Sequence, residues 1–221
     1  MTVKINVDGR TLEAPAGANL LEACLEAGIY IPHLCHLTGE SPPHASCRLC
    51  LVALDDDSRP VPACTVGVRD GLTVRTDTEE VRRLQRAGLR LLLSAHTVNC
   101  RQCPANRRCE LQRMAKFLGM GLRAAPLPND ERPAPRPFFH PHLAIDTEHC
   151  VLCGRCVRTC RRRHGHALLT FAGRGFDTVV SPYPTGTDPT GIPCPDCLAC
   201  IDVCPVGALQ PRAPGNAANG S

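Results

Sequence analysis

One cysteine pattern occurs twice in this chain and restricts its possible folds more than any other feature. The pattern is C-x2-C-x2-C-x3-C, formed by Cys150, Cys153, Cys156 and Cys160 and again by Cys194, Cys197, Cys200 and Cys204. Three cysteines at intervals of three residues can wrap a loop around one small inorganic core. Zinc sites instead use two separated cysteine pairs and do not need a third closely spaced cysteine. The repeated pattern therefore favours two iron–sulfur clusters, and a pair of four-cysteine zinc sites is the alternative.

The same pattern resembles that of bacterial ferredoxins that carry two [4Fe–4S] clusters. In those proteins the fourth cysteine of each run binds the neighbouring cluster, and here Pro205 follows the second run as it does in that motif. The resemblance implies two clusters with exchanged fourth ligands. One ligand set would be Cys150, Cys153, Cys156 and Cys204, and the other would be Cys160, Cys194, Cys197 and Cys200.

The N-terminal part of the chain has the pattern of a small α+β domain. Alternating apolar and polar residues on either side of Asp8-Gly9 predict a β-hairpin. Asn19 can cap the helix that follows, and Gly28 can end it. The expected elements are strands at 3–7, 10–14, 48–54 and 72–75 and a helix at 20–27.

Four cysteines of this domain have the spacing C-x11-C-x2-C-x13-C: Cys35, Cys47, Cys50 and Cys64. Plant-type [2Fe–2S] ferredoxins have a first gap of about four residues, so the first gap here departs from that type. The segments 31–36 and 47–50 resemble instead the [2Fe–2S] domain at the start of the large iron–sulfur subunit of respiratory complex I. This resemblance implies a β-grasp [2Fe–2S] ferredoxin domain over residues 1–77, and a four-cysteine zinc site is the alternative. Cys24 is left over, and we expect it to be a buried thiol.

A histidine and three cysteines form the next motif, H-x3-C-x2-C-x5-C: His96, Cys100, Cys103 and Cys109. Three cysteines alone would leave one iron of a [4Fe–4S] cluster without a protein ligand, and His96 lies one helical turn ahead of Cys100. Imidazole in place of thiolate removes a negative charge, so this cluster should be easier to reduce than an all-cysteine cluster. A zinc site with three cysteines and one histidine is the alternative. The motif resembles complex I-type iron–sulfur subunits, because ordinary ferredoxins lack it.

Helices are expected around this motif, in a small domain over residues 78–122. Asp77 or Thr78 can cap the first helix, which should end near Ser94. Its apolar face is predicted to consist of Leu84, Leu89, Leu91, Leu92 and Leu93. A second helix is expected over residues 107–118.

Composition divides the rest of the chain into three parts. The segment 123–137 is rich in proline and is predicted to be an extended connector. Residues 138–211 are expected to form the two-[4Fe–4S] ferredoxin-like domain, with short strands at 168–171 and 178–180. The last segment, 212–221, has the composition of a disordered tail.

The cysteine content also indicates the compartment. The chain has 221 residues, 16 cysteines and no tryptophan, so its cores must be modest, and bound metal can supply folding free energy to such small modules. We find no signal-peptide pattern and no apolar run of the roughly 18 residues that a membrane helix needs. We therefore expect a cytoplasmic protein without membrane insertion, whose cysteines bind metal and do not form disulfides.

Bound clusters would change the net charge. The formal charge of +4 counts every cysteine as a neutral thiol. An oxidised all-cysteine cluster contributes about −2, and a cluster with one histidine ligand about −1. With one [2Fe–2S] and three [4Fe–4S] clusters bound, the charge becomes roughly −3. The basic residues then compensate bound clusters, and nucleic-acid binding is not needed to explain them.

The sequence contains no motif for a substrate site. It has no G-x-G-x-x-G after a strand and no Walker loop, and no Ser-His-Asp arrangement can be argued. A chain with many one-electron centres and no substrate site is expected to conduct electrons between catalytic partners, without catalytic residues of its own.

The full arrangement, over residues 1–211, resembles a family of iron–sulfur subunits in several complexes. Its length is similar to that of the diaphorase iron–sulfur subunit of bidirectional NAD-reducing [NiFe] hydrogenases. The resemblance implies a hetero-oligomer with an FMN- and NAD-binding diaphorase subunit on one side and a [NiFe] hydrogenase small subunit on the other. It also implies the overall reaction H2 + NAD+ ⇌ NADH + H+, to which this chain would contribute electron transfer.

Three alternatives stay open from the sequence. One is an electron-transfer subunit of an NAD-dependent formate dehydrogenase or another complex I-like assembly. Another is a chain related to [FeFe] hydrogenases, although their catalytic cysteine-rich domain is absent from this sequence. The third is a zinc-binding structural scaffold without a redox role.

Overall fold

The computed structural model describes residues 1–55, 57, 59–123, 140, 142–165, 168–182 and 194–212. The chain divides into two compact units. The first consists of Met1–Leu91 and Met114–Gly121, and the second of Leu92–Arg113 and Leu122–Ser221. Nearly all of the connector predicted at 123–137 and of the tail predicted at 212–221 lies outside the described residues.

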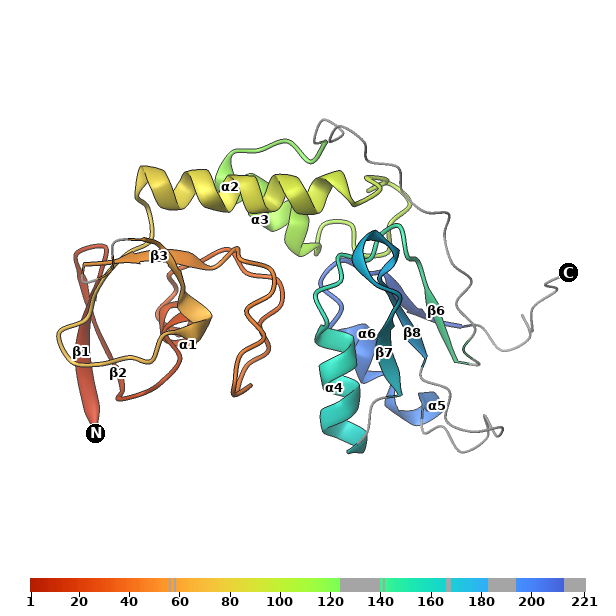
Figure 1. Ribbon diagram of the computed structural model, residues 1–221, viewed down its shortest axis with the longest axis horizontal. Helices are drawn as coiled ribbons and strands as arrows, with labels where there is room; N and C mark the ends of the chain where they lie inside the picture. Colours follow the sequence, from red (N-terminus) through yellow and green to blue (C-terminus); the bar gives the residue numbers. More distant parts are fainter. Residues whose placement is uncertain are drawn as a thin grey trace, which may run out of the picture. The chain divides into compact units, whose positions relative to one another are not determined.

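The first unit is built on a five-stranded sheet with the strand order β2-β1-β5-β3-β4 (Figure 1). The strands are β1 (Thr2–Val7), β2 (Arg10–Pro15), β3 (Leu51–Leu54), β4 (Val61–Pro62) and β5 (Thr73–Arg75). β1 and β2 form the predicted antiparallel hairpin, in which Asp8 and Gly9 both have positive φ. β5 runs parallel to β1 and antiparallel to β3. The sheet therefore joins the hairpin, which ends at Pro15, to strands that begin at Leu51 or later in the sequence.

Helix α1 (Leu20–Glu26) adds its apolar side to the core of this sheet. Asn19 caps the helix as predicted, because its side chain accepts hydrogen bonds from the backbone N–H groups of Leu21 and Glu22 at 3.0 and 3.4 Å. Cys24 is fully buried in the same core, which confirms the prediction of a buried thiol.

Two longer helices follow, α2 (Glu79–Ser94) and α3 (Glu110–Leu118). The Thr78 hydroxyl accepts a hydrogen bond from the backbone N–H of Val81 at 3.2 Å, as expected for the start of α2. Leu89 and Leu93 are buried, but Leu91 is 59% exposed, so its predicted place on the apolar face is wrong. Residues two apart on a helix point in nearly opposite directions, and Leu91 therefore cannot share a face with Leu89.

The described residues of the second unit include two antiparallel pairs of strands and, besides the end of α2 and the start of α3, three further α-helices. The strands are β6 (Leu143–Ile145) with β9 (Leu209–Pro211), and β7 (Leu169–Ala172) with β8 (Val179–Pro182). The helices are α4 (Arg155–His164), α5 (Cys194–Cys197) and α6 (Ala199–Asp202). Aliphatic side chains from β6, β7, β8 and β9 form one core with Cys156 and Cys200. Cysteines are thus part of the packing of this unit.

Two predicted elements begin later than expected. The strand predicted from Arg48 begins at Leu51, and the helix predicted from Arg107 begins at Glu110. Arg48 has φ 52° and Arg107 has φ 70°, values that fit neither a strand nor a right-handed helix. In both places the chain stays in a loop that carries cysteines.

Candidate cofactor sites

A pair of strands and a short helix assemble part of the first cysteine group. β3 and β4 are paired, which brings Cys50, directly before β3, towards Cys64 in the 3-10 helix η1 (Ala63–Thr65). The backbone N–H of Ala63 donates to the Cys50 carbonyl at 2.7 Å. The Asn19 Nδ2 donates to the Cys64 carbonyl at 2.6 Å. The residue that caps α1 therefore also fixes one of the predicted ligands.

The loop that carries Cys35 is attached to helix α1 by one carboxylate. Glu22 Oε1 accepts hydrogen bonds from His36 Nε2 at 3.0 Å and from the backbone N–H of Gly39 at 2.8 Å. His36 is buried, and so is the Cys35 side chain next to it. Helix α1 thus holds this loop close to the sheet, next to which Cys50 and Cys64 lie.

The four thiols of this group form two hydrogen-bonded pairs, Cys35 with Cys47 and Cys50 with Cys64. The bond to Cys47 lowers the pKa of Cys35 to about 4 against the opposing effect of burial. The same bond, followed by burial, raises the pKa of Cys47. In the second pair, the mutual bond lowers the pKa of Cys64 and raises that of Cys50. Thiolates are the form that binds metal, so metal binding to all four sulfur atoms would release the protons that they still carry.

The three cysteines of the histidine motif also come together. Cys109 immediately precedes α3 and is buried, and burial is the main cause of its raised pKa. Charges on Cys103 and Cys100 raise it further, which places both thiols near Cys109. The Cys103 Sγ–H donates to the Val206 carbonyl at 3.7 Å, and the backbone N–H of Glu110 donates to the Pro205 carbonyl at 3.0 Å. This loop is therefore held against the C-terminal segment of the same unit.

His96 is oriented by a backbone carbonyl. Its Nδ1 lies 3.1 Å from the carbonyl oxygen of His149, and the backbone N–H of Thr97 donates to the Glu148 carbonyl at 3.1 Å. Because a carbonyl can only accept, Nδ1 carries the proton in this arrangement and Nε2 carries the lone pair. Histidines that bind metals usually donate their second ring N–H to such a partner. This arrangement gives His96 the tautomer that a ligand bound through Nε2 needs.

Sequence reasoning missed the turn that supplies this carbonyl. Asp146 Oδ1 accepts from the backbone N–H groups of Glu148 and His149, and its Oδ2 lies 2.5 Å from His149 Nδ1. The Asp-x-x-His spacing just before Cys150 was a usable signal for this local turn. Its contact with His96, 53 residues away in the sequence, had no local signal.

A third group surrounds a cavity at the start of α4. Its cysteines are Cys150, Cys153, Cys156 and Cys204, and aliphatic side chains complete the wall. The cavity contains about 330 Å³ of unfilled space, part of it open to solvent. Burial is the main cause that raises the pKa of Cys150 to about 12 and that of Cys153 to about 11. Charge on Cys204 raises both further, so the second cysteine run contributes to this group.

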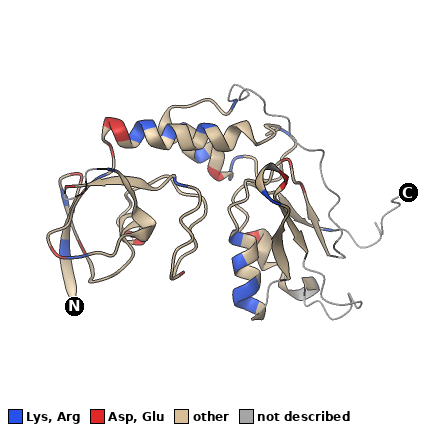
Figure 2. Ribbon diagram, viewed as in Figure 1, with Lys and Arg blue, Asp and Glu red and all other residues tan. Residues whose placement is uncertain are grey.

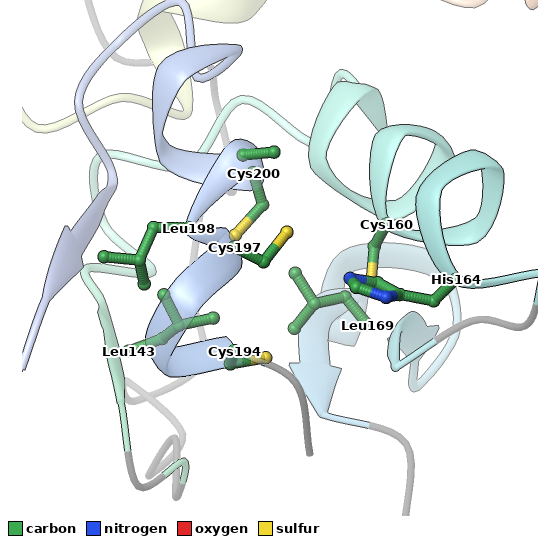
Figure 3. A pocket seen from close by; sticks show the side chains of 9 residues that line it. Leu143, Cys160, His164, Leu169, Cys194, Cys197, Leu198 and Cys200 are labelled. Carbon is green, nitrogen blue, oxygen red and sulfur yellow. The ribbon is translucent and has the colours of Figure 1, made fainter.

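The fourth group lines a similar cavity of about 300 Å³ (Figure 3). Its cysteines are Cys160, Cys194, Cys197 and Cys200, and the wall also includes Leu143, His164, Leu169 and Leu198. Figure 3 shows Cys160 and His164 on one helix and the other three cysteines on the facing segment. Burial, followed by the charge of Cys160, raises the pKa of Cys194 to about 11 and that of Cys200 to about 12.

These groups match the chemistry of an iron–sulfur cluster. In the described part of the chain, no three His, Cys, Asp or Glu side chains lie close enough to share a single metal ion. The third and fourth groups instead offer four sulfur donors each around a wider, largely apolar cavity. Sulfur donors around such a space are what a cluster of several irons requires. The grouping agrees with the predicted ligand sets, while ligation itself, and the place of His96 in its set, stay predictions.

Comparisons with known proteins agree with these observations. Residues 1–79 match the family model of a 2Fe-2S iron-sulfur cluster binding domain, and residues 85–123 match the NADH-ubiquinone oxidoreductase-G iron-sulfur binding region. The chain is 35% identical over 215 residues to an NADH-quinone oxidoreductase subunit of Rhizobium meliloti, a match that covers 94% of this chain and 24% of that protein. It is 33% identical over 210 residues to the NADP-reducing hydrogenase subunit HndD of Solidesulfovibrio fructosivorans, a match that covers 93% of this chain and 35% of that protein. The chain thus spans about a quarter to a third of these relatives.

A solved structure matches nearly end to end. In a crystal structure of NAD+-reducing [NiFe]-hydrogenase in the H2-reduced state, one chain superposes with a TM-score of 0.79 at 32% identity. The match covers 98% of this chain and 90% of that chain. The chain belongs to the iron–sulfur subunit family that NAD(P)-reducing hydrogenases and complex I share. Members of this iron–sulfur subunit family are parts of oxidoreductases, so the redox alternative is favoured over a zinc scaffold. Among the described residues, no helix is both long and apolar enough to cross a membrane.

Proposed function

We propose that this chain is an electron-transfer subunit with one [2Fe–2S] and three [4Fe–4S] clusters. The ligands of the [2Fe–2S] cluster would be Cys35, Cys47, Cys50 and Cys64. The first [4Fe–4S] cluster would be bound by His96, Cys100, Cys103 and Cys109. The second would be bound by Cys150, Cys153, Cys156 and Cys204, and the third by Cys160, Cys194, Cys197 and Cys200. The observation that carries the proposal is the gathering of fifteen cysteines into four groups, with one thiol left in an apolar core. Each cluster accepts and releases one electron at a time when bound, and the chain's task is to hold the clusters in place.

The division into modules follows from the same assignment. We assign a β-grasp [2Fe–2S] ferredoxin domain to residues 1–77, a His-ligated cluster domain to 78–122, and a two-[4Fe–4S] ferredoxin domain to 138–211. The mixed five-stranded sheet with α1 supports the first assignment. The paired short strands around α4 and α6 support the third. The connector at 123–137 and the tail at 212–221 complete the proposed division.

The proposed partners lie at the two ends of an electron path. We assign a flavin- and NAD-binding diaphorase subunit to one end and a [NiFe] hydrogenase small subunit to the other, in a cytoplasmic hetero-oligomer. The overall reaction would be H2 + NAD+ ⇌ NADH + H+. What supports this choice is the near end-to-end match to a chain of an NAD+-reducing [NiFe]-hydrogenase, whose length this chain nearly shares.

A complex I-like assembly is the second candidate. The observation that favours it is the 35% identity to the NADH-quinone oxidoreductase subunit of Rhizobium meliloti over 94% of this chain. The same clusters would then pass electrons from NADH towards a quinone. This candidate differs from the first in its partner at the far end of the path.

The test is to purify the chain from its natural host without oxygen and to identify the subunits that accompany it. We expect a nickel-containing partner and H2-dependent reduction of NAD+ by the purified complex. A partner that contains molybdenum or tungsten would indicate that the complex is a formate dehydrogenase and not a hydrogenase. Membrane subunits together with quinone reduction would favour the complex I-like assembly. A colourless preparation that contains zinc would contradict the proposed electron transfer altogether.

A further inference from the structure

Helix α4 brings a histidine into the cavity of the fourth cysteine group. His164 comes four residues after Cys160, and residues four apart lie on the same face of a helix. Both side chains line this cavity, and His164 is half-buried. Figure 3 shows the imidazole ring projecting from α4 on the same side as the Cys160 side chain, toward the segment that carries the other three cysteines. The fourth cysteine group therefore has a polar neighbour that is not one of its predicted ligands.

The other residues of this helical turn face water. Between Cys160 and His164 lie three exposed arginines, Arg161, Arg162 and Arg163. Figure 2 shows the basic residues along α4. The last turn of the helix thus presents its arginines to solvent and its histidine to the cavity. Because water and salt screen exposed charges, the His164 ring is the group of this turn that is best placed to act on a bound cluster.

The His164 ring can offer this cavity a hydrogen bond that its apolar neighbours cannot. Besides His164, the residues that line the cavity are the four cysteines, three leucines and Ala199. Leucine and alanine side chains have no N–H group, whereas an imidazole ring carries at least one N–H in either neutral form. A cluster held in this cavity would present sulfur atoms as hydrogen-bond acceptors to the ring.

The repeated cysteine pattern supplies a comparison within the same chain. Cys204 is the counterpart of Cys160 in the second run, and the residue four positions after it, Ala208, lines the cavity of the third group. The other residues that line this third cavity are cysteines, aliphatic residues, Gly154 and Pro205. One cavity of the repeat is therefore lined by an imidazole ring where the other is lined by a methyl group.

We propose that His164 donates a hydrogen bond from its ring to a sulfur of the cluster bound by Cys160, Cys194, Cys197 and Cys200, and thereby makes this cluster easier to reduce. The inference rests on the proposed function. Reduction adds one electron to the cluster, and the proton of the donating N–H group stays on the ring. A hydrogen bond to a more negatively charged acceptor is stronger, so the donor stabilises the reduced cluster more than the oxidised one. Hydrogen bonds to the sulfur atoms are among the features that set cluster potentials.

The test measures the midpoint potential of this cluster by redox titration followed by EPR, in the full chain purified without oxygen. A Cys160→Ser variant, which removes a predicted ligand, assigns the signal. His164→Leu removes the donor and keeps an apolar side chain in its place. In this variant we expect the reduction equilibrium constant of the cluster to fall about tenfold, which is about 59 mV for a one-electron couple. His164→Gln keeps an N–H donor, and we expect its equilibrium constant to fall less than about threefold.

Two controls separate the hydrogen bond from other effects of the substitution. The first is the cluster of the third group in the same variants, since His164 does not line its cavity. The second is His142→Leu, the same chemical change at a half-buried histidine that lines neither cavity. We expect less than about a twofold change in both controls, because neither removes a donor from the cluster that is measured.

The inference is overturned if His164→Leu keeps the wild-type potential, if His164→Gln falls as far as His164→Leu, or if the cluster of the third group shifts equally. If His164→Leu does not retain the cluster, His164→Ala is measured in its place, because alanine occupies the equivalent position of the third cavity. The same fall of about tenfold is expected there. A loss of about four irons from His164→Ala as well would make His164 a ligand of the cluster and would overturn the inference. A wild-type chain without iron would instead contradict the proposed function.

Discussion

At the scale of single residues, Gly207 marks a close approach between two segments of the second unit. Its φ is +69°, and an added Cβ would lie 2.7 Å from the Cβ of Ala105. Ala105 belongs to the loop between Cys103 and Cys109, and the neighbouring Val206 carbonyl accepts the Cys103 hydrogen bond. A side chain at position 207 would therefore press on the loop that carries the histidine motif.

We expect Gly207→Ala to destabilise the protein by about 1–3 kcal/mol, because it adds a steric clash with Ala105 to the cost of a left-handed conformation. It should also weaken iron retention at Cys100, Cys103 and Cys109. The control is Gly119→Ala, since Gly119 has φ +63° but no atom within 4 Å of the added Cβ. Thermal unfolding and iron content measure both effects. Equal losses of stability and of iron in Gly207→Ala and Gly119→Ala would show that the contact with Ala105 does not have this role.

Cys24 makes a prediction about alkaline pH. Burial, assisted by the charge of Asp8, raises the pKa of Cys24 from 9.0 to about 11. Below pH 9 the thiol is neutral in both states, so its contribution to stability is fully present. Between pH 9 and 11 the unfolded thiol loses its proton while the folded one keeps it, so stability falls.

We therefore expect the wild type to lose about 2 kcal/mol more than Cys24→Ala between pH 8 and 11. Urea unfolding of both proteins at a series of pH values measures this difference. The variant should be less stable at pH 8, because the substitution leaves a cavity in the core. Parallel stability curves for the two proteins would show that the thiol does not stay protonated.

At the scale of elements, helix α4 serves both cavities of the second unit. Cys156 lines the third cysteine group and Cys160, one turn later, lines the fourth. The facing segment does the reverse, because Cys200 lines the fourth group and Cys204 the third. This arrangement of the thiols is compatible with the predicted exchange of fourth ligands, which stays a prediction.

We expect Cys160→Ser to deplete the cluster of Cys194, Cys197 and Cys200 and to leave that of Cys150, Cys153 and Cys156 in place. Cys204→Ser should have the opposite effect. The measurements are the Mössbauer spectrum and the iron content of each variant relative to the wild type. Complete loss of one cluster would remove about four irons per chain, and partial loss would remove fewer. If Cys160→Ser instead depleted the cluster of Cys150, Cys153 and Cys156, and Cys204→Ser that of Cys194, Cys197 and Cys200, the fourth ligands would not be exchanged.

Several elements could be predicted because their signals are local. The β1–β2 hairpin and the Asn19 cap depend on residues a few positions apart, and both are confirmed. The late start of β3 could not be predicted, because the left-handed conformation of Arg48 belongs to the cysteine loop and has no propensity signal. Leu91 was misplaced because a run of leucines was assigned to one face without regard to helical periodicity.

At the scale of the whole molecule, the cysteine spacing predicts where clusters are bound, because loops around a cluster impose short fixed intervals. The spacing could not reveal the side chains that hold these loops. Asn19 bonds the Cys64 carbonyl across 45 residues, and the His149 carbonyl holds His96 across 53.

The central claim is that fifteen cysteines and His96 hold four iron–sulfur clusters. The most direct test is quantitative iron and acid-labile sulfide analysis of the chain purified without oxygen, combined with EPR of the reduced protein. We predict about 14 irons and about 14 sulfides per chain, with signals from one [2Fe–2S] and three [4Fe–4S] clusters. Zinc in place of iron, without sulfide and without an EPR signal, would contradict the claim.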